Sequence, residues 1–282
     1  MKKKTLAMLL SAALCVSLFA GCSGGTASTP AEEEPAELTG TVNTDGSTSM
    51  ADVMAAFQET FDDIQPGVTV NYSGTGSGSG ITNVLAGTVD IGLSSRALTD
   101  EEKAEGAVEN IVALDGVAVV VNPENTVTDL TIEDIAKIYT GEITNWSELG
   151  GADAPIAVIG RDAASGTRGA FEEIVGVEDA CVYTNEYEST GEVIGSVAGN
   201  PNAIGYASLS AVDDTVIAVQ VNGVAPSEAT VADGTYEIQR PFVMVTKEGT
   251  ELSPAAQAFL EWAMSADAAD EVEAAGCVSP NA

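Results

Sequence analysis

Strand-like and helix-like patterns alternate along most of this chain. A weakly alternating segment at 38–43 precedes apolar residues at helical spacing, namely Met50, Val53, Met54, Phe57 and Phe61. The same order recurs at 68–85 and at 156–175, where a β-type run leads into a short amphipathic segment. Strands that alternate with helices in this way predict an α/β fold.

Several helix starts can be placed from local signals. Thr99 is followed three residues later by Glu102, which is the pattern of a capping box. A capped helix is predicted from Thr131 to Tyr139, and Ser253-Pro254 predicts the start of another. We interpret Trp146 and Trp262 as core residues rather than ligand contacts.

The first residues indicate export. Three lysines precede an uncharged apolar run at 5–20, which is too short for a membrane span and is typical of a secretory signal peptide. Small residues before Cys22 indicate a lipoprotein signal peptide at 1–21 and a lipidated Cys22. The alternative is an ordinary signal peptide with an incidental cysteine, since Phe19 stands where such sites usually carry Leu. Ser, Gly, Pro and Glu dominate 22–37, which predicts a flexible tether. We therefore expect an extracytoplasmic protein, anchored to the cell membrane only through lipid.

The charge of the chain restricts its partners. The formal net charge is −33, and removal of the three leader lysines leaves 7 cations against 43 acids, or −36. Such a body repels nucleic acid and anionic lipid. It also repels anions at long range, so an anion site must be built locally from N–H groups, hydroxyls and a few guanidiniums. Three of the four arginines, Arg96, Arg161 and Arg168, lie in or beside segments rich in Ser, Gly and Thr.

The absence of histidine argues against enzyme classes. There is no His in the chain, which excludes Ser-His-Asp and Cys-His catalysis and His-ligated metals. No metal or cofactor is expected, although a nucleophile hidden at 165–167 keeps a hydrolase as an alternative. Cys181 and Cys277 are interpreted as buried free thiols, with a disulfide as the other possibility.

Four polar segments follow predicted strands and carry the candidate chemistry. They are Gly46 to Ser49, Ser73 to Gly80, Ser94 to Arg96 and Arg161 to Arg168. The first and last open helices, and the free N–H groups of a helix start form a seat for an anion. In the last segment a guanidinium, two hydroxyls and these N–H groups together match a tetrahedral dianion.

These segments resemble the phosphate-binding proteins of ABC transporters, which have the type II periplasmic-binding-protein fold. The resemblance runs along nearly the whole body, and its most specific parts are Ile143-Thr144-Asn145-Trp146 and the Arg161 to Thr167 segment. It implies two lobes joined by a hinge of two crossing strands, for which Val117 to Val121 and Pro241 to Val245 are the candidates. One lobe would comprise 38–115 and 246–282, and the other 116–245.

The resemblance also implies a function and a site. The protein would capture inorganic phosphate in the cleft between the lobes and deliver it, as a monomer, to the permease subunits of an ABC importer. Thr48 would contribute a hydroxyl and Ser49 a backbone N–H. The full set of expected ligand-binding residues is Ser47, Thr48, Ser49, Ser77, Ser95, Arg96, Arg161, Ser165, Gly166 and Thr167.

One position departs from the family pattern. The best-studied members carry an Asp near the position of Ser95, and that carboxylate accepts the proton of HPO₄²⁻ and rejects sulfate. A hydroxyl excludes sulfate less well, so sulfate, molybdate or tungstate remains an alternative ligand, as does a surface or sensory role without transport. Arg96 would add an ion pair to the ligand, or Asp162 would hold Arg161.

Overall fold

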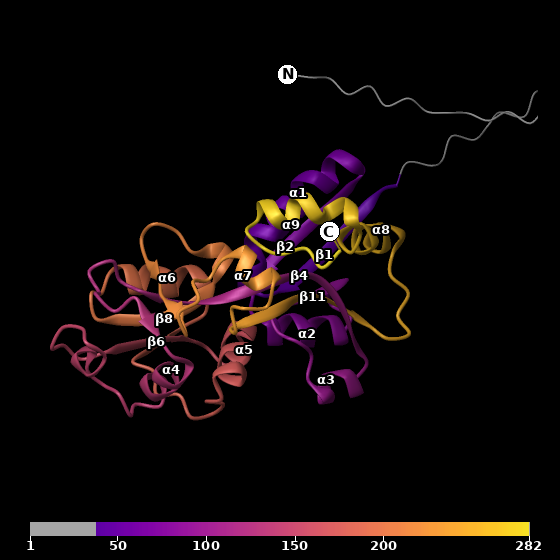
Figure 1. Cartoon of the computed structure of the whole chain (residues 1–282). Coiled ribbons are helices and arrows are strands. Elements are labelled where there is room, and N and C mark those ends of the chain that lie inside the picture. The colour runs from indigo at the N-terminus through magenta and orange to yellow at the C-terminus, as the bar shows by residue number, and fades with distance from the viewer. Residues whose placement is uncertain (1–37, 282) are drawn as a thin grey trace, which may run out of the picture. The chain divides into compact units, whose positions relative to one another are not determined.

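Two separate hydrophobic clusters divide the body of the protein into two lobes. The structure, a computed structural model, describes residues 38–281; the expected signal peptide, tether and Cys22 lie outside this range. The first cluster gathers apolar residues from 42–113 and 242–277, and the second gathers those from 117–238. Figure 1 shows the helices within residues 51–104 and 254–263 on one side and those within residues 132–198 on the other. The expected two-lobed α/β architecture is confirmed.

The first lobe is built on parallel strands covered on both faces. Its elements are β1 (Gly40–Gly46), η1 (Thr48–Met50), α1 (Ala51–Ile64), β2 (Val68–Gly74), α2 (Ser77–Leu85), β3 (Ile91–Ser94), α3 (Asp100–Ala104), α8 (Pro254–Ala263), η4 (Ala266–Ala268) and α9 (Ala269–Ala274). The apolar face predicted for α1 is buried, with Phe57 and Phe61 at most 1% exposed. A smaller cluster that contains Ile81 and Val84 of α2 also includes Val243 and Val245. Helices therefore pack on both sides of the central strands, whereas β2, of which only Val68 is buried, lies at the edge of the sheet.

The second lobe repeats this arrangement with different connections. Its elements are β5 (Asp129–Leu130), α4 (Ile132–Tyr139), η2 (Trp146–Leu149), β6 (Ala157–Arg161), α5 (Gly166–Val175), β7 (Asn185–Tyr187), α6 (Thr190–Ala198), β8 (Ala203–Ser208), η3 (Leu209–Ala211), β9 (Ile217–Ala218), β10 (Gln220–Val221) and α7 (Glu228–Ala232). Helix α4 begins after a capping box formed by Thr131 and Asp134, as the sequence indicates. Trp146 is 2% exposed, which confirms that it belongs to the core.

Two long strands pass between the lobes. Strand β4 (Ala107–Val121) pairs with β11 (Gln239–Lys247) in its first part and with β8 in its last five residues. The chain leaves the first core after Ala113 and returns to it at Phe242. Val117 to Val121 therefore lie inside the second lobe, and the crossing occurs just before them. The return at Phe242 also precedes the boundary expected at 245, because the side chains at 242–245 pack into the first lobe.

One sheet path connects both lobes, in the order β2-β1-β3-β11-β4-β8-β6-β7. The pairs β1–β2, β1–β3, β6–β7 and β6–β8 are parallel, whereas the pairs that β4 and β11 make with their neighbours are antiparallel. Ligands of open parallel sheets bind beyond the carboxyl ends of the strands. The ends of β1, β3 and β6 are where three of the polar segments begin.

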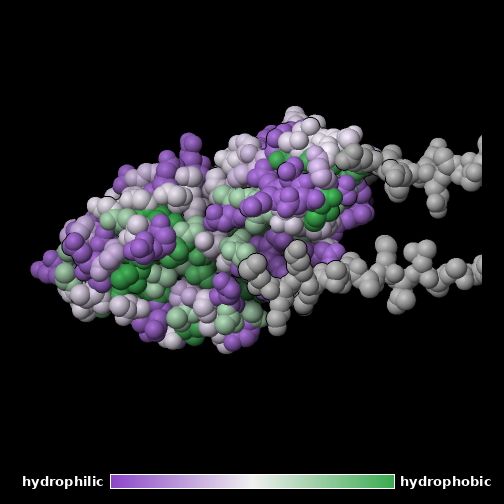
Figure 2. All heavy atoms as spheres, turned by 90° about the horizontal axis from the view of Figure 1, so that it is seen from above, coloured by the Kyte–Doolittle hydropathy of each residue, from purple (hydrophilic) through white to green (hydrophobic). Residues whose placement is uncertain are grey.

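The surface carries both hydrophilic and hydrophobic side chains (Figure 2). On the face seen in Figure 2, hydrophilic residues predominate and hydrophobic ones gather in smaller patches on both halves. Within residues 38–281, no helix has the length and hydropathy needed to cross a bilayer. Cys181 and Cys277 are both free thiols, the first half-buried and the second in the core of the first lobe.

Candidate functional site

Hydroxyl groups from both lobes meet between the strand ends. Ser49 Oγ lies 2.7 Å from Thr167 Oγ1 and 3.1 Å from Thr190 Oγ1. Thr48 Oγ1 lies 3.4 Å from the same Thr190 oxygen. Thr48 and Ser49 follow β1 in the first lobe, and the other two residues open α5 and α6 in the second. We call these four residues the hydroxyl cluster; each hydroxyl can donate or accept, so the cluster can coordinate an oxyanion from several directions.

Arg161 supplies the charge of the site. It ends β6, is 2% exposed, and donates to Thr48 Oγ1 at 3.0 Å and to Thr190 Oγ1 at 3.1 Å. Backbone carbonyls of Tyr187 and Glu188 accept its remaining hydrogen bonds. Burial lowers the pKa of this guanidinium because the charged form loses solvation.

No carboxylate faces the Arg161 guanidinium directly. The other arginines in the part of the chain that the structure describes all form ion pairs: Arg96 with Glu102, Arg168 with Glu172 and Glu186, and Arg240 with Asp115. Arg161 forms none, and the expected partner Asp162 makes no ion pair with it. Buried charges are normally paired, so Arg161 is the guanidinium suited to an external anion.

A second hydroxyl pair faces the first turn of α5. Ser77 Oγ lies 3.3 Å from Ser95 Oγ and accepts the Ser95 N–H at 3.1 Å. A Cβ added to Gly166 would collide with Ser77 Oγ. Only glycine therefore permits this close approach between the lobes. The N-cap of α5 is Ser165, whose hydroxyl accepts the N–H of Arg168 at 3.3 Å.

The first turn of α5 provides backbone donors next to these hydroxyls. Gly166 and Thr167 are the first two residues of the helix, where N–H groups have no partner inside the helix. The positive end of the helix dipole adds to this effect. A helix start, a buried guanidinium and several hydroxyls thus surround one position between the lobes, which suits a small, highly charged oxyanion.

Three expected contacts differ in the structure. Ser47 is buried, and its hydroxyl accepts the N–H of Ser49 at 3.2 Å, so it caps η1. Ser49 accordingly presents its hydroxyl, not its N–H, to the cluster. The Arg96 guanidinium is held by both oxygens of Glu102, at 2.8 and 2.7 Å. It is therefore engaged with α3 rather than with the hydroxyl cluster.

Two features of the site carry no signal in the sequence pattern. Thr190 belongs to a capped helix start that resembles others in the chain, since Ser189 and Glu192 form an ordinary capping box. Its hydroxyl reaches the cluster only because the start of α6 lies beside η1 in the fold. The buried pair of Asp115 and Arg240 is likewise distant in sequence.

That ion pair lies where the two lobes join. Asp115 Oδ2 accepts hydrogen bonds from Arg240 at 2.9 and 3.1 Å and from Ser208 Oγ at 2.8 Å. Arg240 also donates to the carbonyl oxygen of Ser95 at 3.1 Å. Burial raises the pKa of Asp115 and lowers that of Arg240. The pair thus connects the crossing strands, the second lobe and the loop that carries Ser95.

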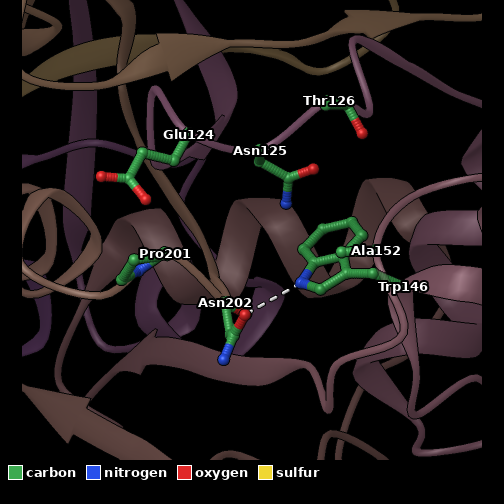
Figure 3. Close-up of a pocket in the computed structure, with 7 residues that line it drawn as sticks. All are labelled: Glu124, Asn125, Thr126, Trp146, Ala152, Pro201 and Asn202. Atoms are coloured by element: carbon green, nitrogen blue, oxygen red, sulfur yellow. Dashed lines mark hydrogen bonds between the residues drawn. The ribbon is translucent and has the colours of Figure 1, made fainter.

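A separate small cavity lies on the second lobe. It has a volume of about 190 Å³ and is lined by seven residues around Trp146 and Asn202, as Figure 3 shows. The indole N–H of Trp146 donates to the Asn202 carbonyl at 3.0 Å. None of its lining residues belongs to the hydroxyl cluster. Within residues 38–281, no group of three or more Cys, Asp or Glu side chains is arranged to hold a metal ion.

Comparisons with a family model and with known proteins identify relatives of the same kind. Residues 30–267 match the model of the PBP superfamily domain. The phosphate-binding protein PstS of Bacillus subtilis is 34% identical over 277 residues, which cover 95% of this chain and 91% of that protein. PstS of Borreliella burgdorferi is 30% identical over 247 residues, with 83% and 88% covered.

Solved structures agree with these relatives. A crystal structure from Clostridium perfringens, described as a candidate phosphate ABC transporter substrate-binding protein with bound phosphate, has a TM-score of 0.82 and 41% identity. The aligned region covers 85% of this chain and 99% of the Clostridium perfringens chain. An ABC-type phosphate transport receptor from Vibrio cholerae has a TM-score of 0.71 and 33% identity, with 85% and 100% covered. This chain belongs to the PBP superfamily and, within it, to the family of PstS proteins.

Proposed function

We propose that this protein captures inorganic phosphate between its lobes and delivers it to the permease subunits of an ABC importer. The observation that carries the proposal is the Arg161 guanidinium, which is buried among hydroxyls without a carboxylate partner. A buried cation of this kind is stabilised when a dianion occupies the cluster. The names of the PstS relatives and the phosphate bound in the Clostridium perfringens structure support phosphate as that anion.

The proposed ligand contacts come from both lobes. Thr48, Ser49, Ser77 and Ser95 would contact phosphate from the first lobe. Arg161, Ser165, Gly166, Thr167 and Thr190 would contact it from the second. Because one ligand satisfies donors on both sides, phosphate would favour the closed arrangement of the lobes over an open one. We regard Ser47 and Arg96 as supports of the site, since their polar atoms are engaged with Ser49 and Glu102.

The protein would act by binding alone, as a monomer. The chain contains no histidine to serve as a general base. The serine and threonine hydroxyls of the cluster contact other hydroxyls and a guanidinium, not a carboxylate that could activate them. Delivery of intact phosphate is the function that this chemistry supports.

The mature protein would be anchored outside the cytoplasm through Cys22. The signal-like segment at 1–21 and the linker composition of 22–37 support this proposal. In a producing cell, Cys22→Ser should move the protein from the membrane fraction to the soluble extracytoplasmic fraction. Retention of the variant in washed membranes would contradict the lipid anchor.

Calorimetric titration of the purified body with phosphate tests the binding function. We expect saturable binding, weakened at least ~30-fold in Arg161→Ala, because loss of a buried charged donor costs at least ~2 kcal/mol. Lys137→Ala removes the same charge from an exposed pair on α4 and should leave the affinity unchanged. Undiminished binding by Arg161→Ala would exclude the proposed site.

Titration with sulfate and molybdate examines the choice of anion. Among the residues in hydrogen-bond contact with the cluster, none is a carboxylate, and Ser95 offers a hydroxyl as the acceptor for the phosphate proton. We therefore expect phosphate to bind more tightly than sulfate, but sulfate to compete measurably. A Ser95→Asp variant should reduce sulfate binding further by charge repulsion. If sulfate bound more tightly than phosphate, the proposed ligand would be sulfate instead of phosphate.

A further inference from the structure

The backbone of Arg161 is held by two side chains of the second lobe. Strand β6 pairs with β8 at Ala157 and Val158, so the ladder between these strands ends before Arg161. The Tyr206 hydroxyl accepts the Arg161 N–H instead, at 3.1 Å. Arg168 donates to the Arg161 carbonyl oxygen at 3.0 Å. Both polar groups of this backbone unit are therefore engaged by side chains.

A ring of hydrogen bonds connects Tyr206 with Arg168. Tyr206 Oη lies 3.1 Å from Tyr183 Oη, and the Tyr183 hydroxyl donates to Glu172 Oε1 at 2.9 Å. The same carboxylate oxygen accepts the Nε–H of Arg168 at 2.8 Å. Because a phenol carries one proton and Tyr183 gives its own to Glu172, the Tyr206 hydroxyl donates to Tyr183. We call these four side chains the Arg161 support.

Packing fixes the two phenols of the Arg161 support. The Tyr206 ring is fully buried and stacks on Phe171, with 4.2 Å between the ring centroids. A Cβ added to Gly160 would lie 2.2 Å from the Tyr183 ring, so only glycine at this position of β6 admits that ring. The Arg168 guanidinium lies 4.9 Å from the centroid of the Tyr183 ring. Burial raises the pKa of both phenols, which keeps both hydroxyls protonated.

We propose that Tyr206 is a positioning residue for phosphate, which acts through the backbone of Arg161. The backbone sets the direction in which a side chain leaves its strand, so a fixed N–H and C=O determine where the guanidinium meets the anion. The hydroxyl cluster contacts only the far end of this side chain. Tyr206, Tyr183 and Glu172 are not among the proposed ligand contacts, so their effect passes through Arg161. This inference rests on the proposed function, because it concerns the same anion seat.

Tyr206→Phe tests the inference, since it keeps the stacked ring and leaves the Arg161 N–H without its acceptor. We expect calorimetry to show phosphate binding weakened about 5-fold. Tyr236→Phe is the matched control. It removes an equally buried phenol of the same lobe, whose hydroxyl donates to the Val117 carbonyl at 2.9 Å, and it should leave phosphate affinity unchanged.

A double-mutant cycle with Arg161→Ala separates positioning from a general loss of structure. If Tyr206 acts through Arg161, Tyr206→Phe should change phosphate affinity by less than about 2-fold once the guanidinium is absent. A merely structural role would weaken phosphate binding by the same factor in both backgrounds. Thermal unfolding should show similar losses of stability in Tyr206→Phe and Tyr236→Phe. The same cycle with Tyr183→Phe, whose phenol is only partly buried, decides the question if Tyr206→Phe does not fold.

Each outcome of the cycle has its own meaning. A loss of affinity confined to the protein that contains Arg161 supports the inference. Unchanged affinity in the tyrosine variants, or an equal loss with and without Arg161, overturns it and leaves the proposed function intact. Absence of phosphate binding in the unsubstituted protein overturns the proposed function and the inference together.

Discussion

Arginines in this chain differ in what faces them, and that difference defines the site. Arg96 and Arg168 lie beside Ser/Gly/Thr-rich turns just as Arg161 does, but carboxylates on α3 and on α5 and β7 hold them. Arg161 instead contacts hydroxyls and carbonyl oxygens. At the scale of single residues, the burial and partners of a guanidinium matter more than the residues around it in sequence.

Thr190 provides a prediction at this scale. Its hydroxyl contacts Thr48, Ser49 and Arg161, and valine would keep the shape while removing these hydrogen bonds. We expect Thr190→Val to weaken phosphate about 10-fold, which corresponds to the ~1–2 kcal/mol of hydrogen bonds lost. Thr190→Ser retains the hydroxyl and should bind nearly as well. Equal affinities of the valine variant and the unsubstituted protein in calorimetry would remove Thr190 from the site.

The ion pair between Arg96 and Glu102 gives a prediction about pH. Burial alone would raise the pKa of Glu102, but hydrogen bonds from Arg96 and Thr99 outweigh it and lower this pKa below its ordinary value of 4.5. A lowered pKa in the folded state stabilises the protein above the unfolded-state pKa, and this stabilisation disappears as the pH falls through the folded value.

Glu102→Gln should therefore lower the free energy of unfolding by about 1 kcal/mol at pH 7. The difference from the unsubstituted protein should close as the pH falls below about 4.5. Urea unfolding at several pH values measures it. Glu251→Gln, at an exposed position without a side-chain hydrogen bond, serves as control. A difference that did not shrink at all as the pH fell below 4.5 would exclude the ion pair as its cause.

At the scale of elements, β4 and β11 both connect the lobes and support the site. Arg240 and Asp115 are direct partners in the register of the two strands, and Arg240 donates to the carbonyl of Ser95. The strands that join the lobes therefore also fix one wall of the candidate site. This arrangement couples the hinge to the position of the Ser95 loop.

Loss of one member of this pair should be costly. Asp115→Asn leaves the Arg240 charge buried and uncompensated, and we expect it to lower the free energy of unfolding by ~3 kcal/mol or more. The double variant Asp115→Asn with Arg240→Gln removes both charges and should recover part of this loss. Guanidinium unfolding curves compare the three proteins. A double variant less stable than either single variant would contradict the argument from charge balance.

The whole molecule combines a negative body with a local anion site. The formal net charge is −33, so an approaching phosphate dianion is repelled until it enters the cleft. Salt screens this repulsion, since the Debye length falls from about 30 Å at 0.01 M to about 8 Å at 0.15 M. The short-range contacts inside the site are screened much less.

The phosphate association rate should consequently rise when the ionic strength increases over this range. Stopped-flow fluorescence of Trp146 and Trp262, or of an attached probe, can follow the rate at constant phosphate concentration. Charge reversal of exposed acidic residues far from the cleft should raise the association rate at low salt. It should also make this rate depend less on ionic strength. A rate that falls with salt would show that the field near the cleft is attractive.

Local patterns in the amino-acid sequence predicted the helices and strands and much of the chemistry. Helical spacing of Phe57 and Phe61 fixed the buried face of α1, and the capping patterns at Thr99 and Thr131 located helix starts. These signals are local, because spacing and capping act within a few residues of the chain. The alternation of such elements was enough to predict an α/β fold.

Which polar groups meet depends on the packing of the whole fold. Thr190 lies 142 residues from Thr48, and Arg240 lies 125 residues from Asp115, so no local pattern connects them. Arg161 and Arg96 lie in similar sequence contexts, but the structure gives them different roles. Packing places Glu102 next to Arg96 and, within residues 38–281, brings no carboxylate into an ion pair with Arg161. Hydrogen bonds and ion pairs depend on distances of about 3 Å, and those distances are set by the fold as a whole.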